Sequence, residues 1–235
     1  MFITIIKTHH LSSLLLLFYY YYLSAIQASE ITYCILTSPR PQISYLSETL
    51  RFLIQEGADT SAIMVMDASK SSNRLLIQQD KTNCSYPVSC QVQQMSLDVV
   101  LALRTCAEHT TDWVVLIEDD VQACPGSIPI LVNTLHSLPI EHTKFAKFSK
   151  FGLANAFPKQ NINPYTNYVI ENLHEVPHDL LISDQGWGAP ERSYIHPTNL
   201  FHHLGQTSTI PERNDPSFLA LYTALRSDIC GELLI

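Results

Sequence analysis

The chain has 235 residues, a formal net charge of −8 and no run of basic residues. An acidic chain of this kind argues against nucleic acid as a partner, because binding to phosphate backbones depends on clustered Lys and Arg side chains. Residues 29–235 are enough for a single domain with a substantial core.

Residues 1–28 have the features of a segment that directs a protein to the secretory pathway. Lys7 lies in a short basic start, and an apolar run extends from Leu11 to Ile26 before small residues. This pattern is typical of a cleaved signal peptide. If the apolar residues before Lys7 are included, the segment is long enough for a type II signal-anchor. Both alternatives place the remaining chain in the lumen of the Golgi or the endoplasmic reticulum.

Six cysteines follow this segment, and an even number in a lumenal protein indicates disulfide bonds. Cys84 and Cys90 lie close together in a polar stretch, so they are the pair we expect first. No Cys-x-x-Cys occurs, which gives a zinc or thioredoxin-like site little support. Asn83-Cys-Ser85 is a glycosylation sequon in the same stretch.

The first half of the chain alternates short apolar runs with segments of helical periodicity. Residues 31–37 are apolar and end at a turn with two prolines, which predicts a strand. Three leucines and Ile54 at helical spacing predict a helix over residues 46–54, with Gly57 as its C-cap glycine. Residues 63–66 predict a second strand, which ends at Asp67.

A polar loop over residues 69–94 leads to a helix predicted over 97–104, with Ser96 as its N-cap. A strand over 113–117 follows. This order predicts an α/β domain with a Rossmann-like, mostly parallel sheet flanked by helices. After Asp120 the pattern is less regular. We expect a strand of mixed exposure over residues 145–151, then loops from Pro158 onward, with a short helix near 218–225.

The stretch Trp113-Val-Val-Leu-Ile-Glu-Asp-Asp120 carries five large apolar residues directly into three acids. Unpaired carboxylates are very costly to bury, so the acids must lie where the strand emerges from the core. A divalent cation is the simplest partner that explains their crowding. An acidic, solvated loop is the alternative, and we favour the metal because other strand ends are also polar.

Ligands of open α/β sheets bind outside the carboxyl ends of the strands. Three predicted strand ends deliver polar residues there, over residues 37–40, at Asp67 and over residues 118–120. In an extended chain Glu118 and Asp120 share a face while Asp119 turns away. Mg²⁺ and Mn²⁺ commonly bind through one or two carboxylates plus substrate phosphates. The chain lacks the P-loop motif Gly-x-x-x-x-Gly-Lys-Ser/Thr and the dinucleotide-binding motif Gly-x-Gly-x-x-Gly. A metal would therefore have to neutralise a nucleotide diphosphate.

The segment Leu116-Ile-Glu-Asp-Asp-Val121 resembles the metal-binding strand end of GT-A glycosyltransferases. More closely, it resembles the Leu-Glu-Asp-Asp segment of the N-acetylglucosaminyltransferase IV family, whose motif the GPI-anchor GalNAc transferase shares. Other segments similar to this family occur in the family's order over roughly residues 31–215. They are Thr37-Ser-Pro-Arg40 with Tyr45-Leu46 and Thr49-Leu50, Leu97-Asp98, Phe148-Ser-Lys-Phe-Gly152, and Phe201-His-His-Leu-Gly205 followed by Ser208.

The resemblance implies a role for each matching residue. Asp120 would bind the metal directly, and His203 would be a late metal ligand, which its place in Phe-x-His-Leu-Gly favours over His202. Glu118 would lie near the ribose or reach the metal through water. The group that binds the nucleotide sugar would comprise Thr37, Arg40, Asp67, Glu118 and Asp119.

An inverting transferase also needs a general base that takes the proton of the acceptor hydroxyl. Asp179, in His-Asp-Leu-Leu, resembles an Asp-Trp-Leu-Leu segment of the family, and Asp184, in Asp-Gln-Gly-Trp-Gly, is its rival. Both stay open. Trp187 either stacks on a sugar from a mobile loop or is buried in a plain turn.

The resemblance implies that residues 29–235 form a GT-A-like catalytic domain. It would use Mn²⁺ or Mg²⁺ to move an N-acetylhexosamine, with GlcNAc favoured, from a UDP-sugar to a glycan, with an N-glycan branch favoured. Transfer of GalNAc to a GPI anchor is the alternative. A non-catalytic carbohydrate-binding protein derived from such an enzyme is a second class. A phosphoesterase is a third, although one acidic cluster and one histidine are few ligands for it.

Overall fold

The computed structural model describes residues 29–38, 45–68, 90–149, 152–175, 181–182, 187, 192–204 and 230. The predictions for residues 1–28, for the sequon and for the helix near 218–225 lie outside these residues. Among the helices that the structure describes, none is long and apolar enough to cross a membrane.

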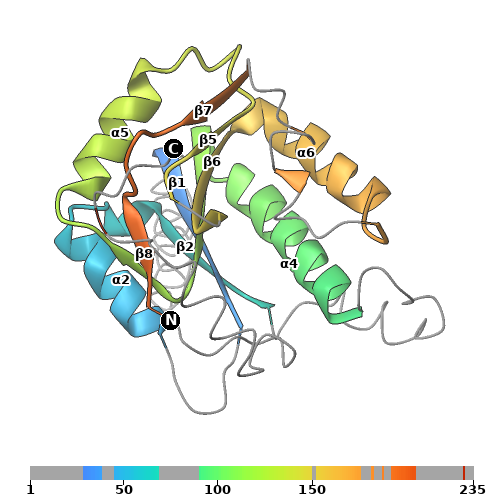
Figure 1. The fold of residues 1–235 in the computed structure, drawn as a ribbon, viewed down its shortest axis with the longest axis horizontal. Coiled ribbons are helices and arrows are strands. Elements are labelled where there is room, and N and C mark those ends of the chain that lie inside the picture. Colours follow the sequence, from blue (N-terminus) through green and yellow to red (C-terminus); the bar gives the residue numbers. More distant parts are fainter. Residues whose placement is uncertain are drawn as a thin grey trace, which may run out of the picture.

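A mixed six-stranded sheet in the order β2-β1-β3-β6-β5-β7 forms the centre of the fold (Figure 1). β1 pairs in parallel with β2 and β3, and β5 pairs in parallel with β7, whereas β6 is antiparallel to both of its neighbours. The predicted α/β domain with a mostly parallel sheet is therefore confirmed. The strands are β1 (Ser29–Thr37), β2 (Ile63–Asp67), β3 (Thr110–Glu118), β5 (Phe145–Lys147), β6 (Ala154–Pro158) and β7 (Ser193–Ile195).

Helices cover both faces of this sheet, so alternate residues of a central strand enter two different cores (Figure 1). α2 (Leu46–Gln55) and α5 (Ser127–Ser137) cover one face, and α4 (Cys90–Ala107) and α6 (Lys159–Glu171) cover the other. In β3, Trp113, Val115 and Ile117 pack in the first core, while Val114 and Leu116 pack in the second. This burial on both faces explains the unbroken apolar run of β3.

A small second sheet lies on the first face. β4 (Val121–Ala123) follows β3 directly and pairs antiparallel with β8 (Phe201–His203). Val121, Ala123 and Phe201 are buried in the core with α2 and α5. The residues just after the three acids are thus tied to a segment far along the chain.

The first half of the chain follows the sequence prediction closely. β1, α2, β2 and β3 occur where they were expected, and Gly57 has a φ of 98° just after the C-cap of α2. The helix before β3 differs, because α4 already begins at Cys90. Ser96 is therefore inside the helix and not its N-cap, and its Oγ donates to the carbonyl oxygen of Val92 (3.0 Å).

The second half is more regular than predicted. α5 and β6 were not expected, and the strand predicted over 145–151 reaches only Lys147 in the described residues. The loop assignment after Pro158 is wrong, because α6 begins at Lys159. Its prolines and asparagines indicated loops, yet its buried residues keep helical spacing. These are Ile162, Tyr165, Thr166 and Val169.

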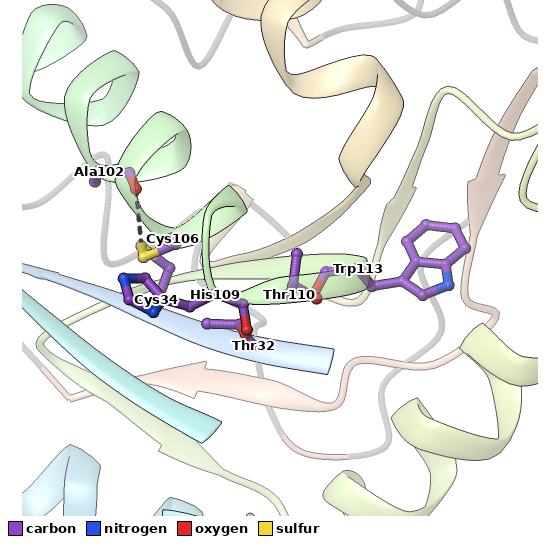
Figure 2. The surroundings of a disulfide bond; sticks show 7 residues. All are labelled: Thr32, Cys34, Ala102, Cys106, His109, Thr110 and Trp113. Carbon is purple, nitrogen blue, oxygen red and sulfur yellow. Dashed lines mark hydrogen bonds between the residues drawn. A yellow bond between two sulfur atoms is a disulfide. The ribbon is translucent and has the colours of Figure 1, made fainter. Parts of the chain in front are cut away.

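Two disulfide bonds join distant segments, as an even cysteine count predicted. Cys34 of β1 is bonded to Cys106 of α4, beneath the second face of the sheet (Figure 2). Cys124, just after β4, is bonded to Cys230. Cys90 is also disulfide-bonded, and its expected partner Cys84 lies outside the described residues.

Candidate functional site

The carboxyl ends of three neighbouring strands meet at one edge of the main sheet. Leu36 of β1 pairs with both Met66 and Glu118, and Thr37 pairs with Asp67. Thr37, Asp67 and Glu118 therefore lie at the same edge, as the strand-helix-strand pattern predicted. Arg40, which was grouped with them, lies outside the described residues.

β8 brings a histidine to this edge. Val121 is the partner of His203 in the β4–β8 ladder, and the backbone N–H of Leu204 donates to the carbonyl oxygen of Asp120 (2.6 Å). His203 Nε2 lies 3.3 Å from Asp120 Oδ2 and 4.0 Å from Glu118 Oε2. His202 precedes it in the same strand, and successive strand residues face opposite sides. The structure thus places His203 beside the acids, and His203 is the histidine that the Phe-x-His-Leu-Gly segment favoured over His202.

Glu118, Asp120 and His203 form a group that can hold a metal ion. One ligand atom from each residue lies within 4.8 Å of the other two. Asp120 is buried, with 2% exposure, whereas Glu118 is exposed. Two carboxylates suit Mg²⁺ or Mn²⁺, and the imidazole favours a transition metal such as Mn²⁺. Three protein ligands also leave coordination positions for phosphate oxygens and water.

Asp119 faces away from this group, toward β1 and α2. Its carboxylate oxygen Oδ2 accepts a hydrogen bond from Thr37 Oγ1 (2.6 Å). Its carbonyl oxygen accepts one from Thr49 Oγ1 (2.8 Å). The three acids therefore group as predicted, with Glu118 and Asp120 together and Asp119 apart, although Asp119 and Asp120 lie in a turn between β3 and β4 and not in the extended chain on which the prediction was based. The hydrogen bonds of Asp119 connect the acidic turn, which comprises Glu118, Asp119 and Asp120, with β1 and α2.

Thr49 is the residue at this edge that the sequence analysis did not treat as part of the site. It lies in α2 on the buried face of the helix, one turn before Leu53. Its hydroxyl also accepts a hydrogen bond from the backbone N–H of Val121 (3.0 Å). A threonine among apolar residues on the core-facing side of a helix was the available signal.

Asp179 and Asp184, the two candidates for the general base, lie outside the described residues. Trp187 is described, and its ring centroid lies 5.9 Å from those of Tyr165 and Tyr168 in α6. Its carbonyl oxygen accepts from Lys144 Nζ (2.8 Å). Lys144 precedes β5, which runs in the same direction as β3, so this contact lies toward the opposite edge from Glu118. These contacts favour the buried-turn interpretation of Trp187 over sugar stacking.

The fold and the cluster define a mixed α/β domain with a carboxylate and histidine site at the carboxyl edge of its central sheet. No protein-family model matches the sequence, and no curated protein matches it.

Among solved structures, the fold is similar to that of a glycosyltransferase involved in the glycosylation of the major capsid of PBCV-1. That match has 14% identity and a TM-score of 0.47 and covers 75% of this chain and 95% of the other. A cytidylyltransferase from Leptospira borgpetersenii matches with 11% identity and a TM-score of 0.44, over 86% and 90% of the two chains. A mannosyltransferase from Pyrobaculum calidifontis, in complex with GDP-Man and Mn²⁺, matches with 12% identity and a TM-score of 0.40, over 77% and 62%. Similarities at these identities concern the fold alone.

Proposed function

We propose that this chain is a metal-dependent glycosyltransferase whose donor is a sugar linked to a nucleoside diphosphate. The observation that carries the proposal is the meeting of Glu118, Asp120 and His203 from two distant segments, within 4.8 Å, at the carboxyl edge of the sheet. This edge is where α/β domains bind their ligands. A cation held there would offset the charge of a diphosphate in a chain without a glycine-rich phosphate loop.

The residues of the chain take distinct parts in this proposal. Asp120, Glu118 and His203 would hold Mn²⁺, or Mg²⁺ as the alternative. A metal bound there supplies Lewis-acid stabilisation of the leaving diphosphate and orients it. Thr37 and Asp67 lie at the same edge, where they can contact the nucleoside half of the donor. Asp179 or Asp184 would supply the general base of an inverting reaction.

The finer proposal concerns the two substrates. The ordered segments that resemble the N-acetylglucosaminyltransferase IV family support a UDP-N-acetylhexosamine donor, with UDP-GlcNAc favoured. They also support a glycan acceptor, with an N-glycan branch favoured and a GPI anchor as the alternative within the same class.

We also propose that the domain works in the lumen of the Golgi or the endoplasmic reticulum. The disulfide bonds Cys34–Cys106 and Cys124–Cys230 support this, because such bonds persist in oxidising compartments and are rare in the cytosol. The segment 1–28 would direct the chain there as a cleaved signal or as a single membrane anchor.

A donor screen tests the proposed function. The full chain is incubated with UDP-GlcNAc, UDP-GalNAc, UDP-glucose or GDP-mannose and a mixture of glycan acceptors, and release of the nucleotide is measured with and without Mn²⁺. We expect release from a UDP-N-acetylhexosamine that depends on Mn²⁺. The proposal is wrong if no donor is turned over, or if chelation of the metal leaves the rate unchanged.

Asp120→Ala provides the residue-level test of the same proposal. Because a bound metal would contribute several kcal/mol of transition-state stabilisation, we expect turnover to fall by about 100-fold or more. Asp112→Ala is the matched control, since Asp112 is a partly exposed carboxylate at the opposite end of β3. Full turnover in Asp120→Ala would contradict a role of this carboxylate in metal binding.

A further inference from the structure

Thr49 takes no part in the proposed chemistry, yet it is completely buried beneath the acidic turn, with 0% exposure. We propose that Thr49, assisted by Thr37, is a positioning residue that holds Asp120 and His203 in the geometry that binds the cation. This inference rests on the proposed function, in which Glu118, Asp120 and His203 bind a divalent metal.

The hydroxyl of Thr49 bridges the two sides of Asp120. It donates to the carbonyl oxygen of Asp119 (2.8 Å) and accepts from the backbone N–H of Val121 (3.0 Å). One side chain therefore restrains the peptide groups that precede and follow the metal ligand. Because both peptide groups are held, the direction in which the Asp120 side chain projects from the backbone is restricted.

The same contact reaches the second ligand. Val121 is the residue that pairs with His203 in the β4–β8 ladder. Leu204, directly after His203, is bonded through its N–H to the carbonyl oxygen of Asp120 (2.6 Å). Anchoring Val121 to α2 thus also restrains the strand that carries the imidazole.

Thr49 is suited to this task because its own position is rigid. Its backbone N–H donates to the carbonyl oxygen of Tyr45 (2.9 Å) in the first turn of α2. Leu53, one turn later, is buried in the core. A threonine in a helix is restricted to two main χ1 rotamers, which limits the directions that its hydroxyl can take.

Thr37 restrains the same turn from another strand. Its Oγ1 donates to Asp119 Oδ2 (2.6 Å), so the turn is tied to β1 as well as to α2. Asp119 is itself buried, with 5% exposure, and a buried carboxylate is stable when it accepts such bonds. Both threonines therefore act on Asp120 through Asp119, and Thr49 also acts through Val121.

The test compares two substitutions of Thr49 in the full chain. Thr49→Val keeps the shape and removes the hydroxyl, and residues that orient metal ligands typically contribute 10- to 100-fold to metal affinity. We therefore expect the dissociation constant for Mn²⁺, measured by calorimetry, to rise by about 10-fold or more. Thr49→Ser keeps the hydroxyl, and its Mn²⁺ affinity should stay within about 3-fold of the wild type, given the modest effect expected of a lost methyl group.

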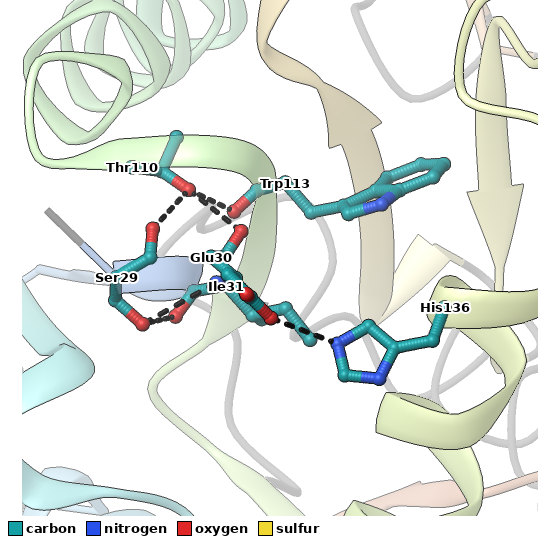
Figure 3. Close-up of polar contacts among 6 residues, drawn as sticks. All are labelled: Ser29, Glu30, Ile31, Thr110, Trp113 and His136. Carbon is teal, nitrogen blue, oxygen red and sulfur yellow. Dashed lines mark hydrogen bonds and ion pairs between the residues drawn. The ribbon is translucent and has the colours of Figure 1, made fainter.

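Thr110 offers a matched control at the opposite end of β3. It is equally buried, with 0% exposure, and its Oγ1 lies 3.0, 3.0 and 2.8 Å from the carbonyl oxygens of Ser29, Glu30 and Trp113 (Figure 3). Thr110→Val should lower the stability of the fold and leave the Mn²⁺ affinity unchanged. Equal losses of Mn²⁺ affinity in Thr49→Val and Thr110→Val would overturn the positioning role.

Three further outcomes are decisive. If Thr49→Val binds Mn²⁺ as tightly as the wild type, the positioning role is wrong and the proposed function is unaffected. The same holds if Thr49→Ser binds Mn²⁺ as weakly as Thr49→Val. Absence of Mn²⁺ binding by the wild-type chain overturns the proposed function itself. If Thr49→Val does not fold, Thr37→Val and Thr37→Ser take its place, with the same expected loss and recovery.

Discussion

His202 and His203 are neighbours in β8, and the alternation of a strand gives them different surroundings. His203 Nε2 is within 4.0 Å of both Glu118 and Asp120, while His202 pairs with Gln122 of β4. We expect His203→Ala to weaken Mn²⁺ binding by about 100-fold or more, because loss of a direct ligand costs at least as much as loss of a residue that only orients one. His202→Ala is the control and should bind as the wild type. Equal affinities of the two variants, measured by calorimetry, would exclude His203 as a ligand.

Tyr33 gives a second prediction at the residue scale. It is 3% exposed in the first core, and burial together with the nearby charge of Asp59 raises its pKa to about 12. A folded-state pKa above the usual value near 10 means that folding favours the neutral phenol. This contribution is complete below pH 10 and is lost as the pH rises toward 12, by a total of about 3 kcal/mol.

Urea unfolding of the wild type and of Tyr33→Phe between pH 8 and 11.5 measures this effect. The wild type should lose more stability over that range than the variant, because the other tyrosines titrate in both proteins. Parallel stability curves would show that Tyr33 ionises as easily in the folded state as in the unfolded state.

At the scale of elements, strong local periodicity predicted β1, α2, β2 and β3, whereas α6 was missed. Pro164 and the asparagines of α6 favour loops in isolation. The helix forms because Tyr165 and Val169 pack in the core that α4 also contributes to, and because Arg104 Nε of α4 donates to Thr166 Oγ1 (2.9 Å). These contacts come from a segment far away in the sequence, so no local pattern contains them.

The disulfide between β1 and α4 leads to a prediction about stability. Cys34 and Cys106 are separated by 72 residues, and bonds that close long loops restrict the unfolded chain strongly. Cys34→Ala/Cys106→Ala should lower the free energy of unfolding by about 2–5 kcal/mol in urea titrations. We expect the folded variant to keep its Mn²⁺ affinity, because the bond lies under the face of the sheet opposite to β4 and β8. A loss below about 1 kcal/mol would contradict the prediction.

At the scale of the whole molecule, the metal ligands join β3 to β8, so cation binding should raise the free energy of unfolding of the whole domain. The unfolded chain does not bring these residues together. Mn²⁺ at about 100 times its dissociation constant should therefore add about 3 kcal/mol and raise Tm by about 5–10 °C. EDTA should reverse the rise, and Asp120→Ala should not show it. An equal rise in Asp120→Ala would locate the stabilising metal elsewhere.

The sequence by itself determined where the acids lie and which of them can act together. A buried apolar strand must release its carboxylates at its end, and the alternation of an extended chain predicted that Glu118 and Asp120 share a side without Asp119. The turn at Asp119 and Asp120 keeps this grouping. Both results follow from neighbours along the chain, and the structure agrees with them.

Only the tertiary structure decided what completes the site. The register of β4 with β8 brings His203 to the acids, and the packing of α2 brings Thr49 beneath the turn. These meetings depend on long-range pairing and packing, whose free energy is gained only when the whole domain folds. For this reason a motif could single out Asp120 and His203, while their contact in space and the positioning role of Thr49 emerged from the fold.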